Sequence, residues 1–325
     1  MRELPPVVNA PMARIAGGAL AAAVTLAGGL GFIGGGYGDA TWVDEQLDVA
    51  AGVEVGVGFI TWALADRVAV VGRVLDRGVR WLWLSFGDPS VFVRAAHDRG
   101  GAVVICQVTS VAEARRVVDA GADVVVAQGH ESGGHGRDGL PMSELVPAVV
   151  AAVDPVPVLA AGGIGTAADR ERATGLGAAG VVVGTRLYAS HEALDSDPAK
   201  HRLVSSSMTR RTTVFDLLRG PEWPAGHTGR ALVNGAVERW HGREHELRAG
   251  LEVQRSRYRQ SAQVDDMDVR VVWAGTGVSD IHEILPAGDI VRAIAAPAAP
   301  EQRAVPASAR TVPGTRPGSS RSVRP

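Results

Sequence analysis

The residues best suited to chemistry in this 325-residue sequence lie in one glycine-rich stretch, QGHESGGHG, at positions 128–136. His135 stands near its end, and a histidine with a near-neutral pKa can take a proton from carbon or give one to an oxyanion. Gly133 and Gly134 allow the main chain to approach a flat ligand closely. The simpler alternative is that His135 belongs to an exposed surface loop.

Two further glycine loops follow short apolar runs. Gly162-Gly163 comes after residues 158–161, and Gly184-Thr185 comes after residues 181–183. Backbone amides that bind a phosphate oxygen require a main chain that is close and often left-handed, which glycine permits. A helix after Gly163 would aim its N-terminal amides at the anion, and Thr185 would add a hydroxyl donor. We therefore expect the two loops to share a phosphate site.

The elements that position these loops follow one pattern. Valine-rich runs bounded by glycine, as at 124–126, 158–161 and 181–183, are typical of parallel strands buried on both faces. Eight strand–helix units in about 185 residues predict a (β/α)8 TIM barrel, whose chemistry lies at the carboxyl ends of the strands. The other expected strands are 7–12, 30–33, 53–60, 80–86 and 101–108, and the expected helices are 13–27, 44–50, 63–77, 89–99 and one capped by Ser110.

The three loops, with their order and spacing, resemble the nitronate monooxygenase family, formerly called 2-nitropropane dioxygenases. The matching residues are 128–136, 160–164, 176–181 and 184–186, and the resemblance spans roughly residues 5–296. It implies an FMN-binding TIM barrel with an active-site histidine, here His135. It also implies a set of cofactor contacts: Pro11 and Met12 beside the isoalloxazine, Gln128 bonded to the flavin, and Gly133, Gly162, Gly163, Gly184 and Thr185 around the cofactor.

Some of these assignments have alternatives, and two positions depart from the family. Met12 would also suit core packing, and Gln128 would also suit a polar barrel rim, while Asn9 and Gln107 are weaker ligand candidates. Many family members carry Asn after the third strand, where this sequence has Gly58. One flavin contact is therefore expected to be missing or replaced. Ser132 stands where Ala is usual, which is a smaller change.

Two patterns resemble known motifs, but the secondary structure expected around them does not fit those motifs. The glycines at 29–34 match a dinucleotide fingerprint, but they run through a strand instead of opening a helix. His130 and His135 are five residues apart, and the glycines between them forbid the helix that would align two zinc ligands. No metal is expected, His130 should be exposed, and Glu131 could orient His135 or cap the loop.

Composition and charge limit the chemistry, the partners and the cellular compartment that we expect for this chain. The single cysteine, Cys106, excludes an internal disulfide and suits a buried structural thiol. Inosine-monophosphate dehydrogenases share a similar glycine pattern, but they need a nucleophilic cysteine on a mobile loop. A net charge of −2 gives no argument for a nucleic acid or membrane partner. Residues 16–36 are apolar but mostly Ala and Gly, so a packed helix and strand in a cytoplasmic protein are expected.

The chain divides into four segments. Residues 1–204 should form the FMN-binding barrel, 205–265 a helical cover of its mouth, and 266–296 a closing segment that packs on the barrel. Residues 297–325 are rich in Ala, Pro and Arg and are expected to be a disordered tail.

The resemblance implies oxidation of alkyl nitronates by O2 to a carbonyl compound and nitrite, with His135 deprotonating the neutral nitroalkane. The partners would be a small-molecule nitronate and O2, with a homodimer left open. One alternative is an NAD(P)H-dependent flavin reductase that acts on an enoyl thioester or a quinone. A second alternative is a flavin- or phosphate-binding protein without turnover.

Overall fold

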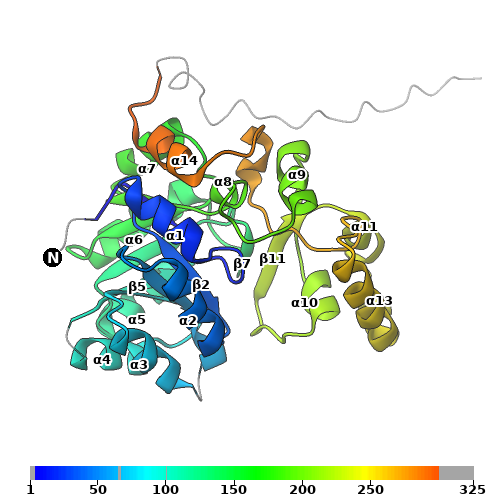
Figure 1. The fold of residues 1–325 in the computed structure, drawn as a ribbon, viewed down its shortest axis with the longest axis horizontal. Coiled ribbons are helices and arrows are strands. Elements are labelled where there is room, and N and C mark those ends of the chain that lie inside the picture. Colours follow the sequence, from blue (N-terminus) through cyan, green and yellow to red (C-terminus); the bar gives the residue numbers. More distant parts are fainter. Residues whose placement is uncertain (1–3, 65–66, 100, 300–325) are drawn as a thin grey trace, which may run out of the picture.

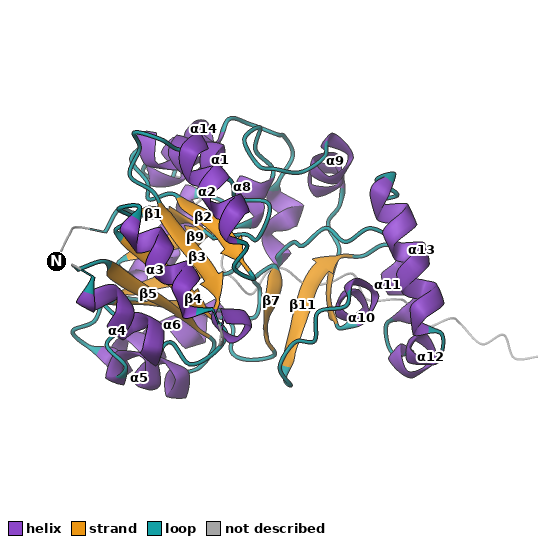
Figure 2. Ribbon diagram, turned by 60° about the horizontal axis from the view of Figure 1, so that its bottom comes forward, coloured by secondary structure: helices purple, strands orange, loops and turns teal. Residues whose placement is uncertain are grey.

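The expected TIM barrel is confirmed. The computed structural model describes residues 4–64, 67–99 and 101–299. Eight parallel strands with alternating helices surround a central core (Figures 1 and 2). In spatial order the strands are β1 (Val7–Asn9), β9 (Gly180–Val183), β8 (Val158–Ala161), β6 (Val124–Gln128), β5 (Val103–Val108), β4 (Trp81–Ser85), β3 (Gly56–Ile60) and β2 (Phe32–Gly36).

The helices outside the barrel lie where helices were expected, although the first and the third of them begin five residues later than expected. Their bounds are α1 (Gly18–Leu26), α2 (Ala40–Val49), α3 (Val68–Asp76), α4 (Ser90–Asp98), α5 (Val111–Asp119), α6 (Met142–Val153) and α7 (Ala167–Gly175). Caps account for two of the starts. The Ser110 hydroxyl accepts the Glu113 amide, as expected, and Asp39 starts α2 four residues early by accepting the Trp42 amide.

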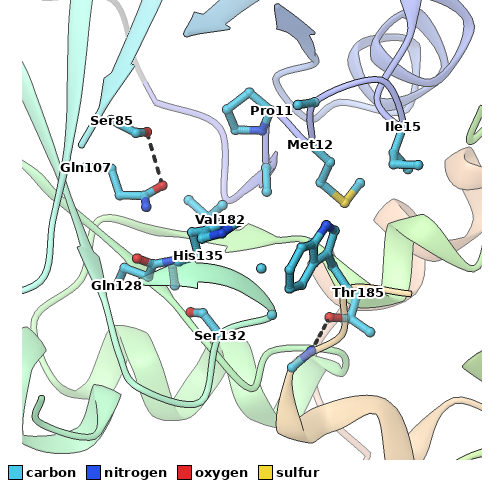
Figure 3. A pocket seen from close by; sticks show the side chains of 18 of the residues that line it. Pro11, Met12, Ile15, Ser85, Gln107, Gln128, Ser132, His135, Val182 and Thr185 are labelled. Atoms are coloured by element: carbon cyan, nitrogen blue, oxygen red, sulfur yellow. Dashed lines mark hydrogen bonds between the residues drawn. The ribbon is translucent and has the colours of Figure 1, made fainter. Parts of the chain in front are cut away.

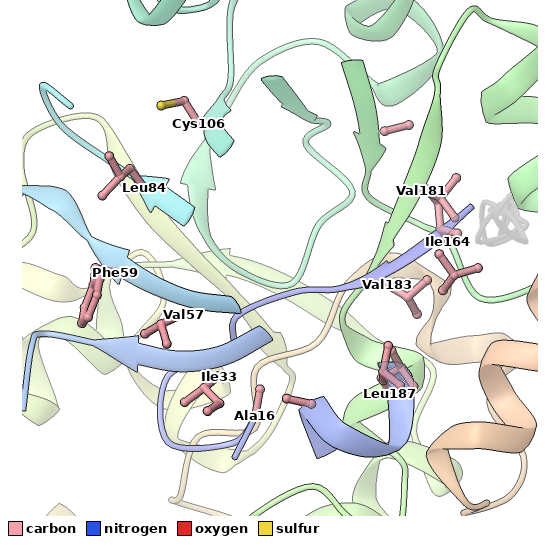
Figure 4. Close-up of a cluster of buried hydrophobic side chains, with 14 of the residues drawn as sticks. Ala16, Ile33, Val57, Phe59, Leu84, Cys106, Ile164, Val181, Val183 and Leu187 are labelled. Carbon is pink, nitrogen blue, oxygen red and sulfur yellow. The ribbon is translucent and has the colours of Figure 1, made fainter. Parts of the chain in front are cut away.

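Side chains of the strands alternate between two apolar layers. Those pointing inward fill the barrel, where the Phe32 and Trp83 rings meet edge to face at 5.3 Å. Those pointing outward, such as Val57, Leu84 and Cys106, belong to the cluster beneath the helices (Figure 4). Both faces of each strand are therefore buried, which is why the strand sequences are apolar runs without alternation.

One side chain closes the barrel between β1 and β2. The main chains there share a single parallel bridge, Val8 with Leu30. Beyond it, Asn9 Nδ2 donates to the Phe32 carbonyl at 2.9 Å, and Asn9 Oδ1 accepts the Phe32 amide at 2.6 Å. Asn9 is fully buried. It therefore satisfies two backbone groups that the short strand pair would otherwise leave unpaired.

The eighth helical position is filled from the far end of the chain. No helix begins at Ser190, which instead forms a parallel bridge with Leu285. The place between α1 and α7 is taken by α14 (Ala287–Ala295). The cover is therefore an insertion between β9 and α14. The short helix α8 (Thr185–Tyr188) precedes the cover. The helices of the cover are α9 (Asp197–Ser205), α10 (Val214–Arg219), α11 (Gly235–Trp240), α12 (Glu244–Ala249) and α13 (Leu251–Gln263).

The cover contains a small sheet in addition to the expected helices. Strands β10 (Thr209–Thr212) and β11 (His227–Leu232) pair antiparallel, and β11 pairs with β7 (Gly134–Arg137). Strand β7 comes from the loop after β6, and it lies beside β11 in both views (Figures 1 and 2). His135 is therefore part of a strand and not of an irregular loop.

Two further expectations concern the ends of the chain. The apolar stretch 16–36 is divided between α1 and β2. Across residues 4–64, 67–99 and 101–299, no helix combines the length and apolarity needed to cross a membrane. Residues 300–325, most of the expected tail, lie outside the described residues.

Replacing Asn9 with Ala should destabilise the barrel strongly. The change leaves the amide and the carbonyl of Phe32 buried without partners, and each such group costs about 1–3 kcal/mol. We expect the free energy of unfolding, measured by urea denaturation, to fall by roughly 2–6 kcal/mol. Gln46→Ala is the control, because its side chain accepts the Gly18 amide at a half-buried site. Equal losses in the two variants would contradict a special role for Asn9.

Candidate active site

A large cavity opens where the barrel strands end. It holds about 1380 Å³ when the open solvent at its mouth is included. Figure 3 shows side chains from separate strands converging on it. All nine residues singled out from the sequence line it: Pro11, Met12, Gln128, Gly133, His135, Gly162, Gly163, Gly184 and Thr185. Their individual roles stay predictions.

The loop after β8 offers amides to an anion. Gly162 and Gly163 both adopt positive φ, 115° and 67°, a conformation that favours glycine. Their neighbour Ile164 also lines the cavity. Asp169 accepts the amides of Gly165 and Thr166 just before α7, so these two donors are already paired. The role of this loop in binding an anion stays a prediction.

The loop after β9 is tied to the closing segment. Thr185 Oγ1 accepts the Gly275 amide at 2.9 Å, so its own hydroxyl hydrogen is left to donate. Gly275 in turn packs against the glycine loop, since a Cβ on Gly133 would lie 2.5 Å from the Gly275 nitrogen. This contact explains why glycine is required at 133.

Two buried polar atoms in the cavity wall have no protein partner within the described residues. Gln128 donates through Nε2 to the His135 carbonyl at 3.0 Å, but its Oε1 is unpaired. The Ser132 hydroxyl oxygen is also unpaired. Buried polar atoms are generally satisfied by protein, water or ligand. Their unpaired oxygens make Gln128 and Ser132 candidates for bonding a ligand, and these roles stay predictions.

The departure at Gly58 has a steric cause. A Cβ at this position would lie 2.4 Å from Pro11 Cβ and 2.6 Å from Pro11 Cγ. The volume that an asparagine side chain would need is filled by the Pro11 ring, and both residues line the cavity. At this position the cavity is therefore lined by the Pro11 ring and not by a polar side chain.

The His135 ring is held on two sides by the cover. Its Nε2 lies 2.7 Å from Asp216 Oδ1, and the two side chains are 9% and 10% exposed. The Trp223 indole stacks on the ring at 3.6 Å between centroids, with 4° between planes. Burial lowers the pKa of His135, while the bond to Asp216 opposes that shift. Burial therefore favours the neutral form of the imidazole, which is the form that a general base requires.

Trp223 also connects the cover to the barrel loops. Its indole Nε1 donates to the Tyr37 hydroxyl at 3.2 Å. Its ring meets Trp62 and Phe86 edge to face at 5.4 and 5.0 Å. These barrel residues follow β2, β3 and β4. The resulting aromatic wall shields His135 from solvent on the mouth side of the cavity.

Two contacts of the histidine were not anticipated from the sequence. Neither Asp216 nor Trp223 was singled out by a motif in the sequence. No spacing rule links Asp216 to a histidine 81 positions earlier.

The neighbours of His135 in sequence have structural roles. The Glu131 carboxylate accepts the Met142 amide at the start of α6, so it caps that helix and has no hydrogen bond to His135. His130 is half-buried and not exposed as expected. Its carbonyl accepts hydrogen bonds from Arg211 and Arg230 of the cover. These bonds fix the loop that leads into β7.

The remaining candidate residues differ in whether they line the cavity or have a structural role. Asn9 is committed to barrel closure and does not line the cavity, whereas Gln107 lines it beside Ser85. Cys106 is 1% exposed, and burial raises the pKa of its thiol to about 12. It is therefore a structural thiol, since nucleophilic attack requires the thiolate.

Gly58→Ala should disturb the cavity floor. The added methyl collides with Pro11, and overpacking of this kind costs about 1–3 kcal/mol. We expect a lower unfolding temperature and less bound flavin per purified chain, measured by thermal denaturation and absorbance. Gly175→Ala is the matched control, because a Cβ there would meet nothing within 4 Å. Retention of full flavin content and stability by Gly58→Ala would contradict the steric argument.

Comparisons with known proteins agree on one family. The family model for nitronate monooxygenase matches residues 40–296. A nitronate monooxygenase of Neurospora crassa is 30% identical over 336 residues, covering 89% of this chain and 87% of that protein.

Two solved structures share the fold along most of their length. FabK from Thermotoga maritima superposes with a TM-score of 0.76 at 29% identity, covering 93% of each chain. A nitroalkane oxidase from Streptomyces ansochromogenes gives 0.73 at 28% identity, covering 90% of this chain and 94% of that one. The chain therefore belongs to the nitronate monooxygenase family and is a flavin-dependent oxidoreductase.

Proposed function

We propose that the chain binds FMN in this cavity and oxidises alkyl nitronates with O2, giving a carbonyl compound and nitrite. The observation that carries the proposal is the placement of His135. A buried, neutral imidazole opens on the same cavity as the glycine loops after β8 and β9. A proton acceptor and a cofactor cradle thus share one space.

The wall of the cavity fits FMN chemically. The amides at Gly163 and Ile164, with the Thr185 hydroxyl, would hold the phosphate. The unpaired Gln128 Oε1 would accept a hydrogen bond from the flavin, and the Ser132 hydroxyl would bond a second polar group. Pro11 and Met12 offer an apolar surface to the ring system. When bound, FMN supplies the redox chemistry, and the protein supplies position and electrostatics.

The protein's own contribution is to make and hold the anion. His135 would remove the proton next to the nitro group, since a neutral imidazole can act as the base. Arg219 lines the cavity, with its guanidinium 5.8 Å from the Trp273 ring centroid. Its positive charge would favour the nitronate over the neutral nitroalkane. Trp223 and Trp273 flank the imidazole and limit access of water.

A second candidate function is reduction of an enoyl thioester or quinone by NAD(P)H. The structural likeness to FabK from Thermotoga maritima fits this alternative, but no better than it fits nitronate oxidation. Anaerobic mixing separates the two functions. Bleaching of the flavin absorbance by ethylnitronate alone supports nitronate oxidation, whereas bleaching by NADH alone supports the reductase. A protein that neither carries flavin nor takes up added FMN would contradict both.

His135→Asn should separate deprotonation from oxidation. The variant should keep its FMN, because the cradle is formed by other residues. Turnover of neutral nitroethane should fall by roughly 10²–10⁴-fold, the usual contribution of a general base. Oxidation of pre-formed ethylnitronate, which needs no deprotonation, should be affected far less.

The control for this experiment is His130→Asn, the same change five residues away. His130 is absent from the cavity lining and bonds the Gly139 carbonyl through Nδ1. It should keep both activities. Full nitroethane turnover by His135→Asn would show that His135 is not the base.

A further inference from the structure

The bond between His135 and Asp216 joins the barrel to the cover. Asp216 lies in α10, whose neighbouring residues Phe215 and Leu217 are buried in the core of the cover. His135 lies in β7, from the loop after β6. The carboxylate reaches the imidazole at Nε2, at 2.7 Å. Helix α10 and strand β7 are anchored separately. Together they determine that Nε2 is the ring nitrogen that faces Asp216.

We propose that Asp216 is a positioning residue that keeps the neutral His135 protonated at Nε2, so that Nδ1 is the atom that accepts the substrate proton. The identity of the substrate rests on the proposed function, whereas the tautomer does not. An ionised carboxylate only accepts hydrogen bonds. Nε2 must therefore carry the hydrogen of a neutral ring, and the lone pair remains on Nδ1.

The ring has little freedom to present its nitrogens differently. Trp223 stacks on it at 3.6 Å with nearly parallel planes, and Trp273 approaches at 4.9 Å. A ring flip would break the bond to Asp216 and leave a buried carboxylate oxygen unpaired, which is costly. Nδ1 meets no hydrogen-bond partner among the described residues, and His135 lines the cavity.

Asp216 is poorly explained as a purely structural residue. Its Oδ2 is buried and has no partner within the described residues, although burial of a carboxylate is costly unless its oxygens are bonded. Its Oδ1 is used for His135. Burial of the Asp216 carboxylate is therefore unfavourable, and the interaction that mainly offsets this cost is its bond to the His135 imidazole.

Asp216 shifts the pKa of His135 in the opposite direction to the positive charges around it. Arg219 on α10 and Arg211 on β10 lower the pKa of His135, as does burial, and His227 on β11 is a further titratable neighbour. Asp216 raises the pKa of His135 through its hydrogen bond and its charge. Removing the carboxylate leaves the opposing effects in place, so the pKa of His135 should fall further.

The proton transfer balances without a redox partner. The C–H bond next to the nitro group breaks, and an N–H bond forms at Nδ1. The electron pair moves onto the nitro group, which gives the nitronate. The resulting imidazolium carries hydrogens on both nitrogens, and the Asp216 carboxylate stabilises its charge through Nε2–H. The base is reset when Nδ1 releases its proton to solvent.

The first test is the tautomer of His135 in the unmodified protein. Nitrogen NMR of the ¹⁵N-histidine-labelled chain near pH 7.5, with His135 assigned by the loss of its signals in His135→Asn, distinguishes the two nitrogens. We expect a protonated Nε2 and an unprotonated Nδ1. A proton on Nδ1 overturns the proposal. This measurement needs no turnover, so it stands even if nitroalkanes prove not to be substrates.

The second test is Asp216→Asn, which keeps the shape but removes the charge. We expect FMN content to be retained and kcat for nitroethane to fall by about 10²-fold or more, with oxidation of pre-formed ethylnitronate little changed. The acidic limb of the kcat/KM profile should move to lower pH. Wild-type kcat and an unshifted limb would overturn the positioning role. If this variant does not fold, the tautomer of the unmodified protein still decides.

Glu252→Gln is the control for loss of an acid from the cover. Glu252 lies on α13, is 82% exposed, and pairs with Arg255 at 3.3 Å, away from His135. Its removal should leave the tautomer, the kcat and the acidic limb unchanged. An equal shift in this variant would assign the effect to net charge and overturn a specific role for Asp216.

Discussion

The structure depends on the backbone pairing between β7 and β11. This pairing sets His135 opposite Gly229 and joins a loop of the barrel to an insertion that begins only after the last barrel strand. The residues of the barrel alone therefore do not complete the site. The cover supplies the acid, the stacked indole and the two arginines that hold the His130 carbonyl. The barrel alone would present a histidine without a defined orientation.

The barrel could be predicted because its signals are local. The valine runs of β6, β8 and β9 are buried on both faces, and a polar residue or glycine marks the end of each. The glycine loops after these strands followed from the same signal, since carboxyl ends of parallel strands meet at one edge. Pro11, Met12 and Gln128 were implied as cofactor contacts by the family resemblance. The cover gave weaker signals. Strand β10 is Thr-Arg-Arg-Thr, with no apolar alternation to indicate a strand.

The interactions of the site were harder to predict for a different reason. A hydrogen bond between residues 135 and 216, or a stack between 135 and 223, depends on where two distant elements dock. Local propensity carries no information on that docking. Glu131, the acid nearest in sequence, was a reasonable candidate to orient His135, but the start of α6 requires it as a cap. The absence of Asn at 58 was visible, whereas its cause was not, because Pro11 lies 47 positions earlier.

The contact between Gly58 and Pro11 limits the order in which this cavity can change during evolution. A larger side chain at 58 is blocked while the proline ring remains, and loss of the ring first would open a void beside the cavity. A substitution at either position changes the space available at the other, so we expect the effects of substitutions at 58 and 11 to be non-additive.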